Sequence, residues 1–256
     1  AEYINRKDLR ADEEQIRNNA QVLISLGGDG TLLKAARIVR ESNVPILGIN
    51  MGGLGFLTEI TYKNLKETLL LLFHKKYSIE KRSMLAVSVS RNAQKFFALN
   101  DVVLSRGPSS RIVELKTFID GDYLTTFTSD GLIVSTSTGS TAHSLSAGGP
   151  IIHPSIDSIL VVPICPHTLS NRPIVVPSRS KIRVKTLTEH PVDYTVDGQI
   201  GGKLEKGGEI EVSLAPFHIS LVRLNLPATA RQAGKKSFYE LLRKKLKWSR
   251  YSIVGK

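Results

Sequence analysis

The chain contains little cysteine and no long apolar run. Its single cysteine, Cys165, cannot form a disulfide within the chain and excludes a cysteine-rich zinc site. A single cysteine fits a reducing, cytoplasmic location. Because Cys165 lies in the apolar run ILVVPIC, we expect its thiol to be buried and inert. No stretch approaches the roughly 20 apolar residues of a membrane span. The polar N-terminus, AEYINRKDLRADEEQ, lacks the apolar core of a secretory signal.

Acidic residues are scarcer than basic ones, which gives a formal net charge of +12 over 256 residues. Such a charge favours polyanionic partners in general and cannot choose among them. Part of it lies in KKSFYELLRKKLKWSR, for which we expect a basic amphipathic helix that packs back on the body of the protein. The apolar residues available to that helix are Phe238, Leu241, Leu242, Leu246 and Trp248. No nucleic-acid-binding motif accompanies the charge, so we expect neither nucleic acid nor membrane as a partner.

The sequence also lacks two common phosphate-binding glycine patterns, GxGxxG and GxxxxGK followed by Ser or Thr. It has VLISLGGDGT at residues 22–31 instead. The nearly continuous apolar residues before the glycines predict a central strand that is buried on both faces. The helical spacing of the apolar residues after them predicts a helix, so the glycines occupy a strand-to-helix turn. Such a turn offers unpaired N–H groups to an anion.

Asp29 does not fit a simple phosphate cradle, because its carboxylate repels phosphate. One interpretation is a helix N-cap. The other is a kinase, in which Asp29 faces an acceptor hydroxyl while the glycines and a metal ion hold the donor phosphates.

Periodicity divides the chain into an α/β part and an all-β part. Residues 11–20 predict a short polar helix, 44–50 a second buried strand and 64–76 another helix, which together indicate βαβ units of a parallel sheet. From Tyr77 onward, apolar and polar residues alternate with a period of two, as in the strands of antiparallel sheets. The expected strands are 79–90, 94–105, 111–119, 123–128, 131–136, 159–164, 173–176, 181–187, 193–196, 209–213 and 217–224. We expect domains at 1–76 and 77–225, a C-terminal segment at 226–256, and a ligand cleft between the domains.

Two polar stretches stand out in the β part. Asn100 and Asp101 open the run LNDVVLSR, either as turn residues or as hydrogen-bonding partners for sugar hydroxyls. In DGLIVSTSTGSTAHSLSAGGP, residues 130–150, a buried strand runs into many small hydroxyl residues and then a helix. Capping would use one or two of these hydroxyls, so we expect others to meet a nucleobase edge or a ribose.

The motif GGDGT resembles the signature shared by NAD kinases, diacylglycerol and sphingosine kinases and 6-phosphofructokinases. The ordered set GGDGT, LNDVV, TSDG and STSTGSTAHSLSAGGP resembles the NAD kinases alone, from about residue 20 to the C-terminal SFYELLRKKLKW. That resemblance implies transfer of phosphate from ATP or polyphosphate to the 2′-hydroxyl of the adenosine ribose of NAD, with Mg²⁺. It also implies a Rossmann-like, phosphofructokinase-like N-terminal α/β domain and a homodimer or homotetramer. The family's first strand is missing, so either the sequence is truncated or its N-terminus is unusually short.

The resemblance also implies roles for individual residues. Asp29 is the proton acceptor at the 2′-hydroxyl. The sequence itself shows no cluster of metal-ligating residues, so we expect Mg²⁺ to have few permanent protein ligands and name none. The expected dinucleotide contacts are Gly30, Lys34, Phe56, Asn100, Asp101, Arg111, Thr128, Asp130, Thr138, Thr141, Ala142, His143, Ser144, Leu145, Ser146 and Gln199. Gly27, Gly28 and Thr31 lie toward the donor phosphates. His143 stands where the family usually has tyrosine, and Thr128 where it often has arginine.

Two other functions keep the same motifs. A dinucleotide-binding sensor would bind NAD without forming NADP. A lipid kinase would share GGDGT and phosphorylate a lipid hydroxyl instead of NAD.

Overall fold

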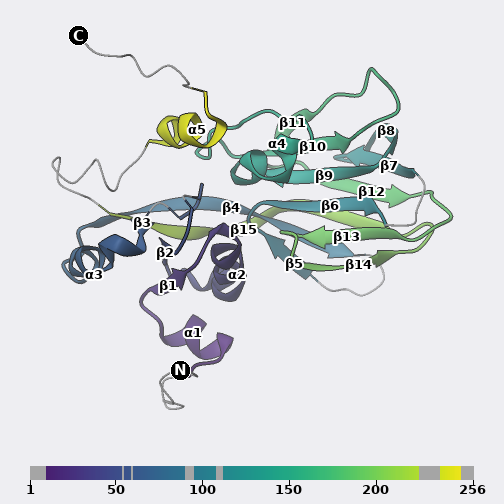
Figure 1. The fold of residues 1–256 in the computed structure, drawn as a ribbon. Helices are drawn as coiled ribbons and strands as arrows, with labels where there is room; N and C mark the ends of the chain where they lie inside the picture. Colours follow the sequence, from purple (N-terminus) through teal and green to yellow (C-terminus); the bar gives the residue numbers. More distant parts are fainter. Residues whose placement is uncertain are drawn as a thin grey trace, which may run out of the picture. The chain divides into compact units, whose positions relative to one another are not determined.

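A computed structural model describes residues 10–53, 55–58, 60–89, 95–107, 112–224 and 237–248. The chain divides into two compact units (Figure 1). The first unit comprises residues 1–35, 44–80 and 220–256, and the second comprises 36–43 and 81–219. Three elements, α2, β4 and β15, have residues in both units.

The first unit is built on parallel strands. Its elements are α1 (Glu13–Asn19), β1 (Leu23–Leu26), the start of α2 (Asp29–Val39), β2 (Ile46–Asn50), β3 (Ile60–Thr61), a 3-10 turn η3 (Tyr62–Asn64), α3 (Leu65–Phe73), the start of β4 (Tyr77–Val89), the end of β15 (Glu209–Leu224) and α5 (Phe238–Leu246). Strand β2 pairs in parallel with β1, with β3 and with the end of β15. The core joins Leu47 and Ile49 of β2 to Val222 and Leu224 of β15, and Leu72 of α3 packs against it.

The expectation that the strand before GGDGT is central and doubly buried is wrong. Among the described residues β1 is the edge strand, since it pairs only with β2. Ile24 and Leu26 are 37% and 53% exposed, whereas every residue of β2 is buried. An apolar run indicates a strand, but pairing partners elsewhere in the chain decide whether that strand is central.

The second unit contains the all-β architecture. Its elements are the end of α2, a 3-10 turn η2 (Arg40–Ser42), most of β4, β5 (Lys95–Ala98), β6 (Asp101–Arg106), β7 (Val113–Ile119), β8 (Asp122–Ser129), β9 (Gly131–Thr136), a 3-10 turn η4 (Thr138–Thr141), α4 (His143–Ser146), β10 (Ser158–Ile164), β11 (Ile174–Pro177), β12 (Ile182–Thr186), β13 (Val192–Val196), β14 (Ile200–Leu204) and most of β15. The order β11-β10-β9-β6-β13-β14 forms one antiparallel sheet. The antiparallel pairs β15-β12-β7-β8 and β4-β5 belong to the other.

The two sheets of the second unit share one apolar core. Leu85 and Leu115 enter it from one sheet, and Leu132 and Val134 from the other. The second face of β9 is also covered, because Ile133 packs with residues of β6, β10 and the segment after α4. All six residues of β9 are therefore buried, which explains its continuous apolar sequence.

The fold class predicted from the sequence, α/β plus all-β, is confirmed by this arrangement. Several local predictions differ. Where one strand was predicted over 94–105, residues 95–98 and 101–106 form two strands, β5 and β6. Residues 209–224 form one strand instead of two, and β14 was not predicted. The expectation of a buried thiol is wrong, because Cys165 is exposed in the turn after β10, with φ at 44°.

The C-terminal helix α5 has two buried apolar residues. Leu241 and Leu242 are buried, and the Ser237 side chain caps the helix by accepting a hydrogen bond from the Glu240 N–H. Trp248 lies beyond the helix and is 62% exposed, so it does not join the apolar side. Across the described ranges, no helix has the length and apolar character needed to cross a membrane.

Candidate active site

In the first unit, Asp29 is the first residue of α2 and its carboxylate binds a second turn of the chain. Oδ1 accepts hydrogen bonds from the backbone N–H groups of Leu57 and Thr58, both at 3.1 Å, and from the Thr58 hydroxyl at 3.1 Å. Oδ2 accepts one from the backbone N–H of Phe56 at 2.8 Å. The carboxylate therefore fixes three consecutive amides that lie 27 to 29 residues away in the sequence.

The second turn follows β2 and has further supports. The Asn50 side chain donates to the Gly53 carbonyl and to the Thr58 hydroxyl. A Cβ at Gly55 would collide with the Asp29 carboxylate and with the Thr58 hydroxyl, so only glycine fits at this approach. Arg223 pairs with Glu80 and donates to the Leu57 carbonyl at 3.4 Å. The turn is thus held from three sides.

This geometry leaves Asp29 one place for a ligand. Each carboxylate oxygen has two lone pairs, and three donors share those of Oδ1, so Oδ2 is the less occupied oxygen. Oδ1 already accepts three hydrogen bonds and Oδ2 accepts one. The side chain is half-buried, so Oδ2 can accept one more hydrogen bond, as an acceptor for a substrate hydroxyl requires.

The other expected residues of the first unit surround this turn. Gly27, at φ 154°, donates its N–H to the Ile49 carbonyl, and a Cβ there would collide with Thr31. Gly28, Gly30, Thr31 and Lys34 are exposed at or near the start of α2. Phe56 reaches Asp29 through its backbone, and its ring faces Lys245 of α5, whose Nζ lies 5.9 Å from the ring centroid. Sequence reasoning missed Lys245, because nothing local connects α5 to the glycine turns.

In the second unit, Asn100 and Asp101 stand at the start of β6. Asn100 precedes the strand and is half-buried, whereas Asp101 is its first residue and is only 4% exposed. Burial, and then the negative charge of Asp197, raise the pKa of Asp101 to about 7. Near neutral pH this group therefore exists both as a carboxylate and as a carboxylic acid, which can accept or donate a hydrogen bond.

Most hydroxyl groups of the segment from Ser135 to Ser140 form hydrogen bonds with the backbone of the protein itself. Ser135 and Thr136 donate to the carbonyls of Asn100 and Leu99, and Ser137 donates to the Ile156 carbonyl. Ser140 donates to the Ser137 carbonyl and accepts from the Ile152 N–H. The prediction that these hydroxyls face a ligand is therefore wrong for most of the run: they brace the turn between β9 and α4.

The expected contact residues from Thr138 to Ser146 differ in their exposure. Thr138 is buried, and its hydroxyl accepts from the buried Arg82. Ser144 is buried as well. The remaining expected contacts here are exposed or half-buried, namely Thr141, Ala142, His143, Leu145 and Ser146.

The expected contact residues of the second unit do not all lie close together in the structure. Asp101 pairs with Ser135 and Ser105 pairs with Gly131, so Asp130 lies at the opposite end of the β6–β9 pair. Asp130 is five residues from Ser135, the partner of Asp101, a separation of roughly 17 Å along the strands. Asp130 forms a 3.0 Å ion pair with Arg106. Thr128 is half-buried on β8, and its carbonyl accepts from the His167 N–H. Arg111 lies outside the described residues.

Gln199 has a partner within the second unit. Its side-chain oxygen accepts a hydrogen bond from Arg37, near the end of α2. The same guanidinium lies 3.5 Å from Oδ2 of Asp197. Arg37 carries no local motif, and Asp197 belongs to an Asp-Gly turn signal that predicts a turn only, so sequence reasoning gave neither residue a role in the site.

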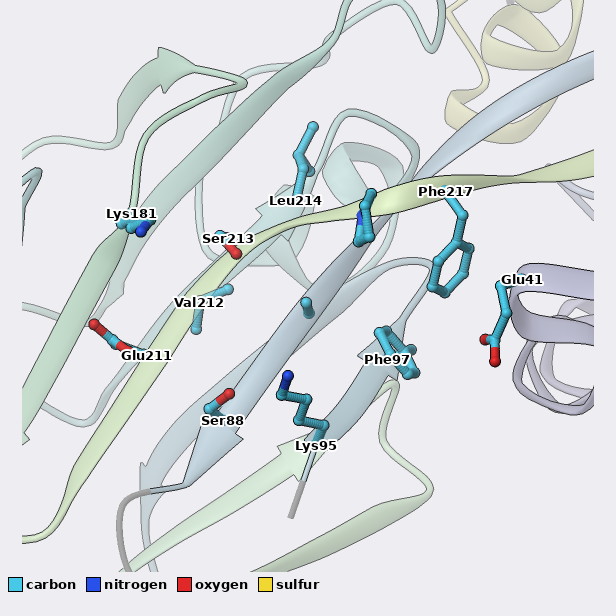
Figure 2. A pocket seen from close by; sticks show the side chains of 12 residues that line it. Glu41, Ser88, Lys95, Phe97, Lys181, Glu211, Val212, Ser213, Leu214 and Phe217 are labelled. Atoms are coloured by element: carbon cyan, nitrogen blue, oxygen red, sulfur yellow. The ribbon is translucent and has the colours of Figure 1, made fainter. Parts of the chain in front are cut away.

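A cavity of about 520 Å³ lies within the second unit (Figure 2). The rings of Phe97 and Phe217, with centroids 5.0 Å apart, stand toward one end, and Lys181 and Glu211 toward the other. None of the residues expected from the sequence to bind nucleotide lines this cavity. The expected contacts are on the turns described above.

Comparisons with known proteins agree with both parts of the chain. Residues 4–77 match the ATP-NAD kinase N-terminal domain, and residues 99–224 match the ATP-NAD kinase C-terminal domain. A protein named NAD kinase from Trichlorobacter lovleyi is 46% identical over 241 residues, which cover 92% of this chain and 81% of that protein. One of the same name from Geotalea daltonii is 45% identical over 242 residues, which cover 93% and 82%.

Solved structures agree as well. Yeast NADH kinase complexed with NADH superposes with a TM-score of 0.82 at 32% identity, covering 96% of this chain and 71% of that one. An NAD kinase from Archaeoglobus fulgidus in complex with ATP gives a TM-score of 0.72 at 30% identity, covering 83% and 81%. With its two domain matches and its relatives over most of their length, the chain belongs to the NAD kinase family.

Proposed function

We propose that this chain transfers the γ-phosphoryl group of ATP to the 2′-hydroxyl of the adenosine ribose of NAD, forming NADP. The observation that carries the proposal is the geometry of Asp29, whose carboxylate is fixed by three backbone amides and keeps one acceptor position on Oδ2. A fixed acceptor of this kind can orient an attacking hydroxyl and take its proton.

In this reaction Asp29 receives the hydrogen bond of the 2′-hydroxyl and then its proton, as the ribose oxygen attacks the γ-phosphorus. The ribose is held by Asn100 and Asp101, and the nucleoside contacts the residues from Thr141 to Ser146. Gly30, Lys34 and Phe56 complete the dinucleotide contacts near Asp29, and Gln199, Thr138, Thr128, Asp130 and Arg111 are the remaining proposed contacts. Positioning and neutralisation of charge supply most of the catalysis in phosphoryl transfer.

The donor phosphates lie toward Gly27, Gly28 and Thr31 at the start of α2, where the positive end of the helix dipole favours anions. In the part of the chain that the structure describes, no three His, Cys, Asp or Glu side chains gather to hold a metal ion. Mg²⁺ usually keeps several waters and binds one or two carboxylates together with substrate phosphates. We therefore propose that Mg²⁺ arrives with ATP, where it neutralises the phosphate oxygens. The enzyme is further proposed to act in the cytoplasm as a homodimer or homotetramer.

A coupled assay for NADP tests the function. The purified chain is given NAD or NADH as acceptor and ATP or polyphosphate as donor, with Mg²⁺ or with EDTA. We expect NADP from NAD and ATP, and loss of activity with EDTA. NAD binding without product would instead indicate a sensor, and phosphorylation of diacylglycerol in place of NAD would indicate a lipid kinase.

A further inference from the structure

The turn between β13 and β14 carries a buried carboxylate. Three residues, Asp197, Gly198 and Gln199, link the paired Val196 and Ile200, and Asp197 and Gly198 have positive φ, at 49° and 63°. The Asp197 side chain has no exposed surface. A carboxylate taken out of water in this way must be compensated by hydrogen bonds or by a cation.

The compensation comes from the backbone at the start of β6. Oδ1 of Asp197 accepts from the N–H groups of Asn100 at 2.8 Å and Asp101 at 3.2 Å, and Oδ2 accepts from Leu99 at 3.0 Å. The backbone N–H of Asp197 in turn donates to the Asp101 carbonyl at 2.9 Å. One side chain thus sets the path of three successive peptide units.

The same peptides are fixed on their carbonyl side. The Leu99 carbonyl accepts from the Thr136 hydroxyl at 2.6 Å, and the Asn100 carbonyl accepts from the Thr136 N–H at 2.9 Å. A Cβ at Gly139 would collide with the Asn100 carbonyl. The backbone of the Asn-Asp pair is therefore clamped between the Asp197 turn and the hydroxyl-rich segment.

A cation completes the arrangement. Arg37, near the end of α2, lies 3.5 Å from Oδ2 of Asp197 and donates from its other amino group to Gln199. Its side chain is 13% exposed. The guanidinium offsets part of the cost of burying Asp197 and fixes the direction of the carboxylate.

We infer that Asp197 and Arg37 are positioning residues for the dinucleotide, which hold Asn100 and Asp101 in the orientation that receives the ribose. The inference rests on the proposed function. Neither residue contacts substrate in it. A neutral amide cannot replace the carboxylate, because the amide has one acceptor oxygen and its NH₂ group would face the Leu99 N–H and Arg37, which are also donors.

The test compares Asp197→Asn and Arg37→Met with the wild type in steady-state assays that vary NAD and ATP separately. Asparagine tolerates positive φ, so Asp197→Asn keeps the turn. We expect its KM for NAD to rise about tenfold or more while its KM for ATP stays within about twofold. Arg37→Met should show the same pattern at about threefold, and Arg37→Lys, which keeps the cation, should recover part of the loss. Asp193→Asn, on the same strand β13 with a half-exposed side chain, is the matched control and should behave as wild type.

The pH dependence gives a readout that a purely structural role would not move. Asp197 from the β13–β14 turn raises the pKa of Asp101, and Arg37 of α2 is the cation beside Asp197. In Asp197→Asn the pH midpoint of the KM for NAD should move below its wild-type value. Circular dichroism and the midpoint of thermal unfolding establish that each variant is folded, and if Asp197→Asn is not, Arg37→Met decides.

The outcomes separate this inference from the proposed function. A wild type that forms no NADP removes the proposed function. An active wild type whose folded variants keep the wild-type KM for NAD, or lose affinity equally for both substrates, overturns the positioning role.

Discussion

Two carboxylates in this protein each accept hydrogen bonds from three successive backbone amides, one at a half-buried site and one at a buried site. Asp29 accepts from the amides of residues 56–58, and Asp197 from those of residues 99–101. Asp29 is half-buried, whereas the Asp197 side chain is fully buried and has Arg37 as a cationic partner. Hydrogen bonds from the backbone to a carboxylate give rigidity in both cases. Exposure then decides whether the carboxylate can also meet a substrate.

The largest expected effect is a loss of turnover when Asp29, the more exposed of the two carboxylates, is replaced. Asp29→Asn replaces the acceptor on Oδ2 and puts an NH₂ group against backbone donors. Since positioned acid–base groups contribute about 10²- to 10⁴-fold, we expect turnover to fall about 10³-fold. Thermal unfolding should show a folded protein, and Asp122→Asn, on the exposed start of β8, is the control. Near-normal turnover in folded Asp29→Asn would remove the proton-acceptor role.

A smaller effect is expected from disturbing the turn at residues 55–58 in a variant that keeps the Asp29 carboxylate. In Gly55→Ala the new methyl group would collide with the Asp29 carboxylate, so the second turn must shift. Overpacking of this kind costs about 1–3 kcal/mol, and a displacement of about 1 Å near the reacting groups can cost about 10²-fold in rate. Denaturant titration and the NADP assay measure both. Gly53→Ala is the control, because a Cβ there meets nothing within 4 Å. Equal behaviour of the two variants would show that the clamp does not depend on Gly55.

The smallest expected effect is on the free energy of unfolding. It concerns Asp101, whose backbone N–H donates to the buried Asp197. The pKa of Asp101 is raised to about 7 in the folded chain, from 3.8 in the unfolded one. The folded state therefore binds more protons between these values, and the stability from this group is present at low pH and is lost as the pH rises through about 7. The free energy of unfolding of the wild type, measured relative to Asp101→Asn, should fall over that interval.

Asp120→Asn gives the opposite sign as a control. A hydrogen bond from the Lys181 backbone N–H lowers the pKa of Asp120, so its contribution is present at neutral pH and is lost as the pH falls below 3.8. Urea titrations from pH 3 to pH 8 compare the two variants. A difference between wild type and Asp101→Asn that stays constant with pH would contradict the raised pKa.

The predictable parts of the molecule were those in which neighbours in sequence decide the structure. Helical spacing after GGDGT predicted α2, and period two predicted most strands of the second unit. The ordered motifs predicted the family, which the comparisons confirm. The central place given to β1 and the buried thiol given to Cys165 were wrong, because both depend on what packs against the segment from elsewhere.

The site shows the same division. Asp29 was predicted as its central carboxylate, and its role there remains a proposal. The interpretation of the small hydroxyls as ligand contacts missed their use in bracing the turn after β9, because the sequence does not show which carbonyls lie within reach.

The sequence by itself determined the alternation of strands and helices, the change of period near Tyr77 and the membership of the family, since each depends on residue types at short spacing. Only the tertiary structure decided which carboxylate clamps which peptides. The partners lie 27 residues apart for Asp29 and Phe56, and 98 for Asp197 and Leu99. Hydrogen bonds over such separations form only where the packing of the whole unit brings donor and acceptor to about 3 Å.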